Sequence, residues 1–408
     1  MPQYANGKTT TDGIVFMYDT GDTDNSYKGE PTTNRFLVQG TSGFGAAADN
    51  NVTFPNQGTG TFIRLGYGQT FGDYTIQPGD VVYKYNLGGY GCHYHGNTSS
   101  IPAGAYVTFT FDYYVSPGTT IENNTLANIE NYGGGALGTG VTAPNSLLGV
   151  WQTVSFTAGP TTSTGTQAMF LYPGGCGPRF GNTGYILYKN PQVEWKSHKT
   201  PFVQGTRSDT QGLLDLSGKG SSIDLANVSF DSSAQIYFDA TNDRISLTPS
   251  TYGITNQFTI EVVCYPTTQV NGMFNFIGPN GSDRGIMAHW PWSSDYGYLD
   301  ITNTAGGFYR WYKVNAGILN VKALYHFILK PSGQVVVKQN NNVMIPDGTD
   351  TFVGNVSLGT SNTIGAFNPS GGLPWGGNIY VFKVYNRALT DAETTQNYLS
   401  YKKRFNLS

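Results

Sequence analysis

The densest group of side chains that could recognise a ligand lies in the segment HWPWSSDYGY, residues 289–298. Its aromatic rings could stack on the C–H faces of sugars, and a carboxylate beside them could accept hydrogen bonds from sugar hydroxyl groups. Proline between two tryptophans favours a loop or a strand edge, where at least one indole would be exposed. The segment therefore predicts a carbohydrate-binding site, with the candidate residues His289, Trp290, Trp292, Asp295, Tyr296, Trp311 and Trp375.

The same aromatic residues have two other interpretations. Each ring buries a large apolar area, so the rings could instead pack in the core of a β-protein. They could also form a contact with another protein. The sequence leaves these alternatives open, and the stability of Trp290→Ala and Trp292→Ala variants would separate them.

A second group with possible chemistry is CHYH, residues 92–95. Side chains alternate along a strand, so His93 and His95 would share one face. A metal ion needs at least three ligands, and no Glu follows at the spacing found in cupins. Three copies around a threefold axis could supply six histidines. The pair therefore predicts either a metal site on a trimer axis or two histidines that are hydrogen-bonded on a sheet surface.

Nothing in the sequence predicts catalysis. Glycoside hydrolysis needs two carboxylates at a defined separation. Glu261 lies in FTIEVV, with no second carboxylate two residues further on. Signatures of Ser-His-Asp triads and of phosphate-binding loops are absent or no better than chance in a chain with 54 glycines. We therefore expect no catalytic residue.

The composition indicates strands and tight turns. Aromatic residues make up 14% of the 408 residues and charged residues only 12%, with a net charge of −3 and no basic stripe that would suggest nucleic acid. Three cysteines are an odd number, which argues against a disulfide framework, although Cys92 and Cys176 could be bridged. No apolar run is long enough to span a membrane, and we expect no signal peptide.

The periodicity predicts an all-β fold. In YVTFTFDYY, residues 106–114, the apolar side chains of Val107, Phe109, Phe111 and Tyr113 fall on one face. Turn signals such as QPGD, IPAG and SPG separate the strand candidates. We expect two tandem antiparallel β-sandwich (jelly-roll) domains at 36–205 and 206–408, an extended N-terminal arm at 1–35 and a short C-terminal helix.

The expected helix begins after residue 390. Thr390 and Glu393 have the spacing of a capping box. Ala392, Thr395 and Leu399 fall at helical spacing and are the predicted buried face. A helix this short is marginal alone in water, so it should dock on a sandwich.

Residues 206–408 resemble the laminin-G-like, concanavalin-A-like jelly rolls. The segments that carry the resemblance are LLDLSGKG (213–220), QIYFDATNDRI (235–245), FTIEVVCYP (258–266), YHFIL (325–329) and YNRALTDAE (385–393). In that family a similar helix follows the last strand and covers one end of the sandwich. By analogy with some of its members, Asp239, Asn242 and Asp243 could bind Ca²⁺, and the same residues could equally form a tight turn.

Two further resemblances concern the rest of the chain. Residues 36–204 are similar to jelly-roll carbohydrate-binding modules in YKNPQVE (188–194) and TPF (200–202). GIVFMYD (13–19) and GEPTTN (29–34), together with the order of the domains, resemble structural proteins of tailed bacteriophage virions. In those particles such domains decorate heads, tails or fibres.

These resemblances imply a non-enzymatic structural protein at the virion surface, of the head-decoration, whisker or tail-fibre type. The arm is too poor in apolar residues to fold alone, so its partner surface would be its own second domain or another chain. Expected partners are other virion proteins of the capsid or tail, further copies of the chain, as in a trimer, and a host-surface glycan. No cofactor is expected beyond the Ca²⁺ named above. The residues expected to anchor the arm in the virion are Gly13, Tyr18, Tyr27, Glu30 and Asn34. The alternatives are a secreted or virion-borne glycan-processing enzyme and a free lectin-like protein.

Overall fold

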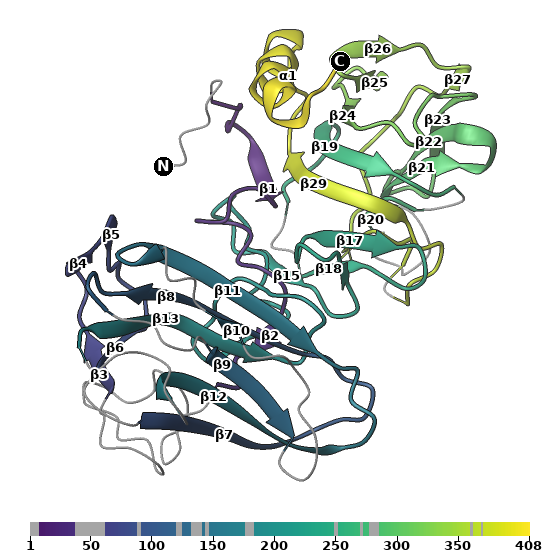
Figure 1. Ribbon diagram of the computed structural model, residues 1–408. Helices are drawn as coiled ribbons and strands as arrows, with labels where there is room; N and C mark the ends of the chain where they lie inside the picture. The colour runs from purple at the N-terminus through teal and green to yellow at the C-terminus, as the bar shows by residue number, and fades with distance from the viewer. Residues whose placement is uncertain are drawn as a thin grey trace. The chain divides into compact units, whose positions relative to one another are not determined.

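The computed structural model describes most of the chain. The described residues are 8–36, 62–87, 91–119, 125–131, 141–142, 147–175, 183–248, 252–269, 272–276, 285–359, 362–368 and 370–408. Within them the regular structure is β-strand apart from short 3₁₀ turns and one α-helix, α1 (Asp391–Phe405) (Figure 1). The predicted all-β class with a C-terminal helix is confirmed. The described part of the chain holds no helix that is both long enough and apolar enough to cross a membrane.

The chain divides into two compact units. The first sandwich comprises Thr32–Arg207, and the second sandwich comprises Met1–Pro31 together with Ser208–Ser408. The chain thus begins in the second sandwich, leaves it for the first and returns two residues beyond the predicted boundary. In topology, the first sandwich is an insertion in the second.

The first sandwich consists of two antiparallel sheets. The four-stranded sheet has the order β10 (Val141–Thr142), β9 (Thr125–Asn131), β12 (Gly165–Gly175), β7 (Gly91–Ile101). The five-stranded sheet has the order β11 (Trp151–Ala158), β8 (Val107–Val115), β13 (Tyr185–Glu194), β6 (Val82–Asn86), β3 (Phe62–Leu65). Two short ribbons complete it: β4 (Thr70–Phe71) with β5 (Tyr74–Thr75), and β2 (Thr32–Thr33) with β14 (Thr206–Arg207). The face of β8 predicted to be buried does lie in the core of this sandwich.

The second sandwich has two larger sheets, with the core between them. Sheet I has the order β16 (Ser229–Phe230), β17 (Ile236–Asp239), β29 (Gly376–Tyr385), β19 (Phe258–Pro266), β24 (Ala323–Leu329), β25 (Val335–Gln339), β26 (Asn342–Met344). Sheet II has the order β15 (Ser222–Asp224), β18 (Ile245–Thr248), β28 (Asn362–Ile364), β20 (Phe274–Phe276), β21 (Ile286–Trp292), β22 (Tyr296–Thr302), β23 (Phe308–Lys313), β27 (Gly348–Thr349).

The N-terminal segment is part of the second sandwich, which differs from the separate arm expected from the sequence. Strand β1 (Ile14–Asp19) pairs antiparallel with β29, beyond the point where β17 pairs with the same strand. The rings of Phe16 and Tyr18 are fully buried, each about 6.2 Å from the ring of Phe382. Of the two partner surfaces considered for the arm, its own second domain is the one the structure shows.

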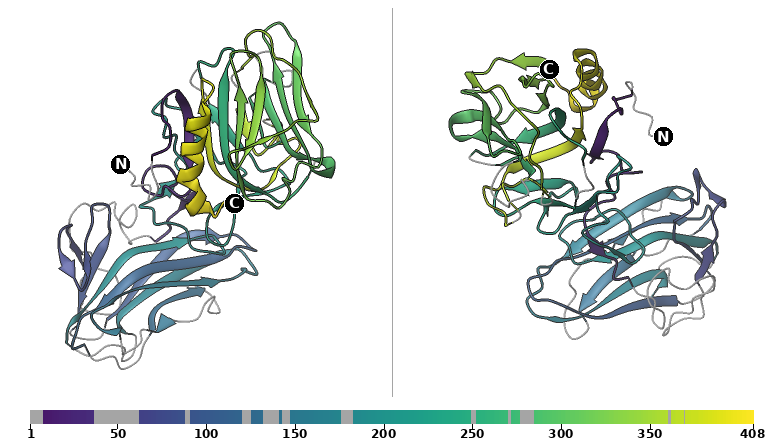
Figure 2. Two further views of the ribbon diagram at one scale, coloured as in Figure 1. Left: turned by 90° about the horizontal axis from the view of Figure 1, so that it is seen from above. Right: turned by 180° about the vertical axis from the view of Figure 1, so that it is seen from behind.

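Helix α1 packs on the outer face of sheet I, where it lies beside β1 (Figure 2), and not over one end of the sandwich. Its predicted capping box is confirmed: the Thr390 hydroxyl accepts from the Glu393 amide at 3.3 Å, and the Glu393 carboxylate accepts from the Thr390 amide at 2.9 Å. The predicted buried face was wrong, because Ala392 is exposed and Leu399 is 55% exposed. The residues that α1 buries are Thr394, Asn397, Tyr398, Ser400 and Tyr401.

The buried face of α1 is largely polar because it covers charged groups on sheet I. Glu261, His326 and Lys383 are each fully buried there. Glu261 Oε2 lies 3.0 Å from His326 Nε2, and Glu261 Oε1 lies 3.0 Å from Lys383 Nζ. Asn397 of α1 donates to the same carboxylate at 2.5 Å and accepts from the Thr10 amide at 2.7 Å. A hydrogen-bonded network around Glu261 and Asn397 therefore joins the helix, the N-terminal segment and the sheet.

Candidate functional site

Three of the tryptophans predicted to contact a ligand lie in the core of the second sandwich. Trp290 and Trp375 are 0% exposed and Trp311 is 1% exposed. Alternation along β21 turns Trp290 inward, where its ring lies 4.9 Å from that of Phe327, and Trp375 Nε1 donates to the Trp290 carbonyl at 2.6 Å. These three residues cannot stack on a sugar, so their assignment to the site was wrong.

The residues that alternate with this core face form a strip of rings on the outer face of sheet II. His289 on β21 lies opposite Tyr298 on β22, and Tyr298 lies opposite Tyr312 on β23. Trp292 lies opposite Tyr296 one row further along. We call these five residues the aromatic strip. Side chains directly opposite each other on neighbouring strands are close enough to contact, which explains why the rings form a continuous surface.

The rings of the aromatic strip are closely spaced, and most are partly accessible. Tyr296 and Tyr298 stack at 5.9 Å with an interplanar angle of 18°, and Tyr298 lies 6.2 Å from Tyr312. His289 lies 4.5 Å from Trp292 in an edge-on arrangement and is itself only 5% exposed. Trp292 and the three tyrosines are half-buried. The strip therefore offers ring surface that is fixed by packing and still reachable from solvent.

An ion pair lies in the next row of the same face. Arg310 Nε and Nη2 donate to the two carboxylate oxygens of Asp300 at 2.6 and 2.8 Å. The Asp300 side chain is fully buried, whereas that of Arg310 is 34% exposed. The guanidinium carbon lies 4.7 Å from the Tyr298 ring and 5.2 Å from the Phe308 ring. The hydrogen bonds to Asp300 raise the pKa of Arg310, so this group is a permanent cation beside the strip.

Asp295 does not serve as a free acceptor for a ligand. Its carboxylate accepts backbone N–H groups of Gly317 at 2.7 Å, Ile318 at 3.1 Å and Leu319 at 3.0 Å. Three donors from one turn occupy it, and its role is to hold that turn against the end of β21. The assignment of Asp295 to sugar hydroxyl groups was therefore wrong.

The aspartates considered for Ca²⁺ are engaged in their own turn. The Asp243 carboxylate accepts from the Asp239 amide at 2.7 Å and from the Ser229 hydroxyl at 3.2 Å, and burial raises its pKa. The Asp239 carboxylate accepts from the Thr241 amide at 2.8 Å. In the described residues no group of three or more His, Cys, Asp or Glu side chains is arranged to hold a metal ion. Of the two interpretations, the tight turn accounts for these bonds.

The His-x-His pair lies where the structure gives only the backbone. His93 and His95 are residues of β7, opposite Leu171 and Met169 of β12. Their side chains are outside the described residues, as is Cys176, so the metal site and the Cys92–Cys176 bridge stay predictions.

The residues expected to anchor the arm in a particle are turned inward. Tyr18 is in the core, and the buried Tyr27 donates its hydroxyl to the Ala234 carbonyl. Asn34, in the first sandwich, donates to the Pro191 carbonyl at 3.0 Å and to the Val203 carbonyl at 3.2 Å.

The other two anchor candidates also serve the second sandwich itself. Glu30 is buried, and Gly13 has φ +77 with the Arg387 side chain packed on it. All five residues lie within their own sandwich, which gives them contacts there, and their role in anchoring to a particle stays a prediction.

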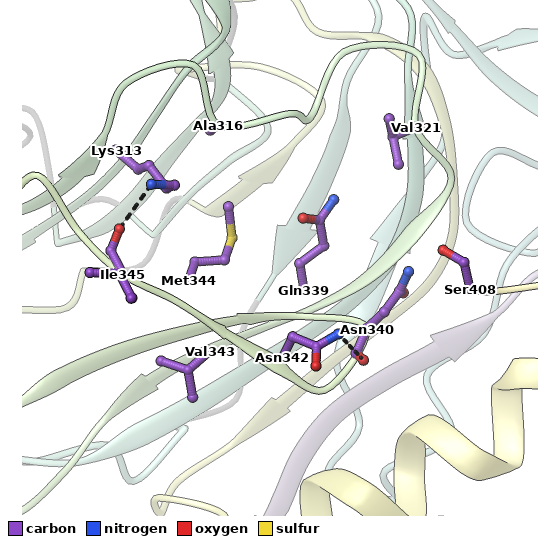
Figure 3. Close-up of a pocket in the computed structure, with 10 residues that line it drawn as sticks. All are labelled: Lys313, Ala316, Val321, Gln339, Asn340, Asn342, Val343, Met344, Ile345 and Ser408. Atoms are coloured by element: carbon purple, nitrogen blue, oxygen red, sulfur yellow. Dashed lines mark hydrogen bonds between the residues drawn. The ribbon is translucent and has the colours of Figure 1, made fainter.

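An open cleft of about 460 Å³ lies at the β25–β26 hairpin (Figure 3). Val343 and Ile345 are 60% and 76% exposed at its rim, and Lys313 Nζ donates to the Ile345 carbonyl at 3.0 Å. None of the ten lining residues drawn in Figure 3 is aromatic. The cleft offers amide and aliphatic groups and lacks a ring platform, so the aromatic strip is the better candidate for contacts with sugar rings.

Sequence reasoning found part of the strip and missed the rest. His289, Trp292 and Tyr296 were among the candidates, and Tyr298 ends the segment that was singled out, whereas Tyr312 was not considered. The signal was present: FYRWYK in β23 alternates, so Tyr312 must face away from the buried Trp311. The pairing register that places Tyr312 opposite Tyr298 could not be read from one sequence.

Fold and site together define a two-sandwich β-protein with an aromatic strip on one sheet face. The sequence matches no protein family and no curated protein. Among solved structures it is similar to the receptor binding domain of botulinum neurotoxin D, with 11% identity over 47% of this chain and 50% of that chain and a TM-score of 0.37. The binding domain of Paraclostridial Mosquitocidal Protein 1 is 14% identical over 46% of this chain and 49% of that chain, with a TM-score of 0.38. The binding domain of botulinum neurotoxin serotype G is 12% identical over 46% of this chain and 48% of that chain, with a TM-score of 0.38. The chain matches about half the length of each, and these values are too low to say what it binds.

Proposed function

We propose that this protein is a non-enzymatic glycan-binding protein whose ligand lies on the aromatic strip. The observation that carries the proposal is the cross-strand row of Tyr298 and Tyr312, continued by Tyr296, on a face that the protein leaves half exposed. Aromatic faces that are held apart by strand geometry and reachable from water suit the apolar faces of pyranose rings. The Arg310 guanidinium beside them supplies directional hydrogen-bond donors.

The proposal is non-enzymatic because two carboxylates beside the strip, those of Asp300 and Asp295, are held by other groups of the protein. Asp300 is buried in its pair with Arg310, and Asp295 is held by three backbone amides. Glu261 has His326 and Lys383 as partners, an arrangement that also occurs in catalytic sites. All three residues are fully buried beneath α1, where a substrate cannot reach them. We expect glycan binding without hydrolysis. Release of new reducing ends from a bound polysaccharide would favour the alternative, a glycan-processing enzyme.

We further propose that the protein acts at the surface of a tailed-phage particle, as a head-decoration, whisker or tail-fibre protein. The resemblance of residues 13–19 and 29–34 to structural proteins of tailed-phage virions supports this location at the particle surface. In the second sandwich the N-terminal segment is bound to β29, so attachment to capsid or tail proteins would use other surfaces, and a homotrimer is one arrangement that would provide them. Mass spectrometry and immunogold labelling of purified particles test the proposal. Detection of the protein only in the free lysate, and not in purified particles, would favour the alternative of a free lectin-like protein.

Binding to the strip is tested with two substitutions and a matched control. Tyr298→Ala and Tyr312→Ala each remove one stacking ring, which should weaken binding to host-surface polysaccharide about fivefold or more. Tyr67→Ala removes a tyrosine that is 77% exposed on the first sandwich and should leave binding unchanged. Equal binding by all three variants would remove the strip from consideration. Repeating the assay with EDTA tests whether Ca²⁺ takes part.

A further inference from the structure

We infer that the cleft at the β25–β26 hairpin binds the acetamido group of an N-acetylated sugar. In this arrangement Asn340 donates to the acetamido carbonyl and Gln339 accepts from the acetamido N–H. The inference rests on the proposed function and adds a second contact point, which takes a sugar substituent and not a sugar ring. It comes from two side-chain amides that line the cleft and from the apolar side chains around them.

The hairpin turn fixes the position of Asn340. Asn340 and Asn341 form the turn between Gln339 and Asn342, with positive φ values of 46° and 67°. Asn340 is only 7% exposed, yet it lines the cleft. The Leu324 amide donates to its Oδ1 at 2.9 Å, which identifies the other atom of the side-chain amide as Nδ2. In the described residues this Nδ2 makes no hydrogen bond, so the nearly buried amide presents a donor to the cleft.

The neighbouring amide, that of Gln339, offers the complementary group. Its Nε2 donates to the Tyr325 hydroxyl at 3.1 Å and to the Gly317 carbonyl at 3.3 Å. A carbonyl can only accept, so the bond to Gly317 sets the orientation of this amide, and Oε1 is left without a donor in the described part of the chain. The Gln339 and Asn340 side chains extend to the same side of the hairpin in Figure 3. One donor and one acceptor on adjacent residues match the carbonyl and the N–H of a secondary amide.

Apolar side chains provide a contact for the methyl group of an acetamido substituent. The pairing of β25 with β26 puts Met344 on the same face of sheet I as Gln339. Met344 is 7% exposed, and Ala316 and Val321 also line the cleft. A methyl group that lies against these side chains is removed from water, which favours binding. The cleft volume of about 460 Å³ lies in the range of sites that hold a small ligand.

A peptide strand added to the edge of β26 fits the cleft less well. Strand β26 ends the order of sheet I, and in a two-residue hairpin the N–H and C=O groups of Val343 point away from β25. The next carbonyl on that edge, that of Ile345, already accepts from Lys313 Nζ at 3.0 Å. An added strand would have to break this bond in order to continue beyond Val343. The cleft therefore favours a single amide group over a chain of them.

The test compares triacetylchitotriose with cellotriose, two trisaccharides of the same linkage in which each sugar carries either an acetamido group or a hydroxyl group. Calorimetric titration of the full-length protein should give about tenfold tighter binding of triacetylchitotriose. Asn340→Asp keeps the acceptor for the Leu324 amide and replaces the donor by an oxygen, so it should remove this preference. The control Asn341→Asp puts the same charge on the next residue, which bonds to Thr395 of α1 and does not line the cleft, and it should keep the preference.

A second variant fills the cleft and leaves both amides in place. Val321→Phe should weaken binding of triacetylchitotriose about tenfold without changing that of cellotriose. The melting temperature shows whether each variant is folded, and Val321→Phe decides the question if Asn340→Asp is not.

Equal binding of the two trisaccharides, no binding of triacetylchitotriose, or a preference that persists in a folded Asn340→Asp protein would overturn the inference. Binding of acetyl-alanyl-alanine amide as tight as that of triacetylchitotriose would overturn the assignment to a sugar. The proposed function is decided separately by the Tyr298 and Tyr312 variants on polysaccharide: weaker binding by them supports it, and unchanged binding overturns it.

Discussion

Trp290→Ala should mainly lower stability, whereas Trp292→Ala should mainly weaken binding, although only one proline separates the two residues. Trp290 is fully buried, with its ring 5.2 Å from Tyr325, 4.9 Å from Phe327 and 6.1 Å from Trp311. Trp290→Ala removes this packing and leaves a cavity, which typically costs about 3–5 kcal/mol. Trp292 is half-buried on the outer face, so Trp292→Ala should cost about 1 kcal/mol or less.

The difference is large enough to measure by differential scanning calorimetry. For a unit of about 200 residues, each kcal/mol shifts the melting temperature by about 2–4 °C. Trp290→Ala should therefore lower the transition of the second sandwich by about 6–20 °C and leave that of the first sandwich in place. Trp292→Ala should melt within about 4 °C of the unmodified protein and bind glycan more weakly. A Trp290→Ala protein that melts normally would refute the placement of this ring in the core, and with it the alternation that defines the strip.

Three other predictions concern α1 and the N-terminal segment. Thr390→Ala removes the capping box and should destabilise the second sandwich by about 1 kcal/mol in chemical denaturation, with glycan binding per folded molecule unchanged. Burial raises the pKa of Glu261, but the charge of Lys383 and the hydrogen bond of His326 outweigh this and bring it down to about 2. Its contribution to stability should thus be complete above about pH 4.5 and be lost as the pH falls towards 2; a Glu261→Gln, Lys383→Met double variant should show less acid sensitivity in that range. Deletion of residues 1–19 removes β1 and should lower the melting temperature of the second sandwich, whereas an independent arm would be lost without effect.

The sequence was a good guide to strands, to the capping box and to the class of fold, because these depend on local patterns. The alternation in β8 and the spacing of Thr390 and Glu393 are examples. It was a poor guide to which ring faces solvent. Trp290 and Trp292 have the same type and nearly the same neighbours, and only the bulge between His289 and Trp292 in the pairing of β21 with β22 decides their directions.

The buried face of α1 was missed for another reason. Apolar periodicity identifies a face that packs on an apolar surface. The surface beneath α1 carries Glu261, Lys338 and Lys383. Asn397 of the helix donates to Glu261, and Thr394 accepts from Lys338 Nζ at 2.8 Å. Partners of this kind are far apart in the chain and become visible only in three dimensions. Likewise, the apolar run of β1 gave no sign of the strand, β29, with which it pairs.

The insertion of one sandwich within the other has a consequence for the order of synthesis. Strand β1 is made before the inserted sandwich, whereas its partner β29 and the helix α1 are made after it. At about 5–20 residues per second, the interval between synthesis of β1 and synthesis of β29 is on the order of half a minute. The inserted sandwich can fold during that interval, since all of its strands lie within one continuous stretch. Pairing of β1 with β29 then completes the second sandwich, and the Thr10 amide donates to the Asn397 side chain across a separation of 387 residues in the sequence.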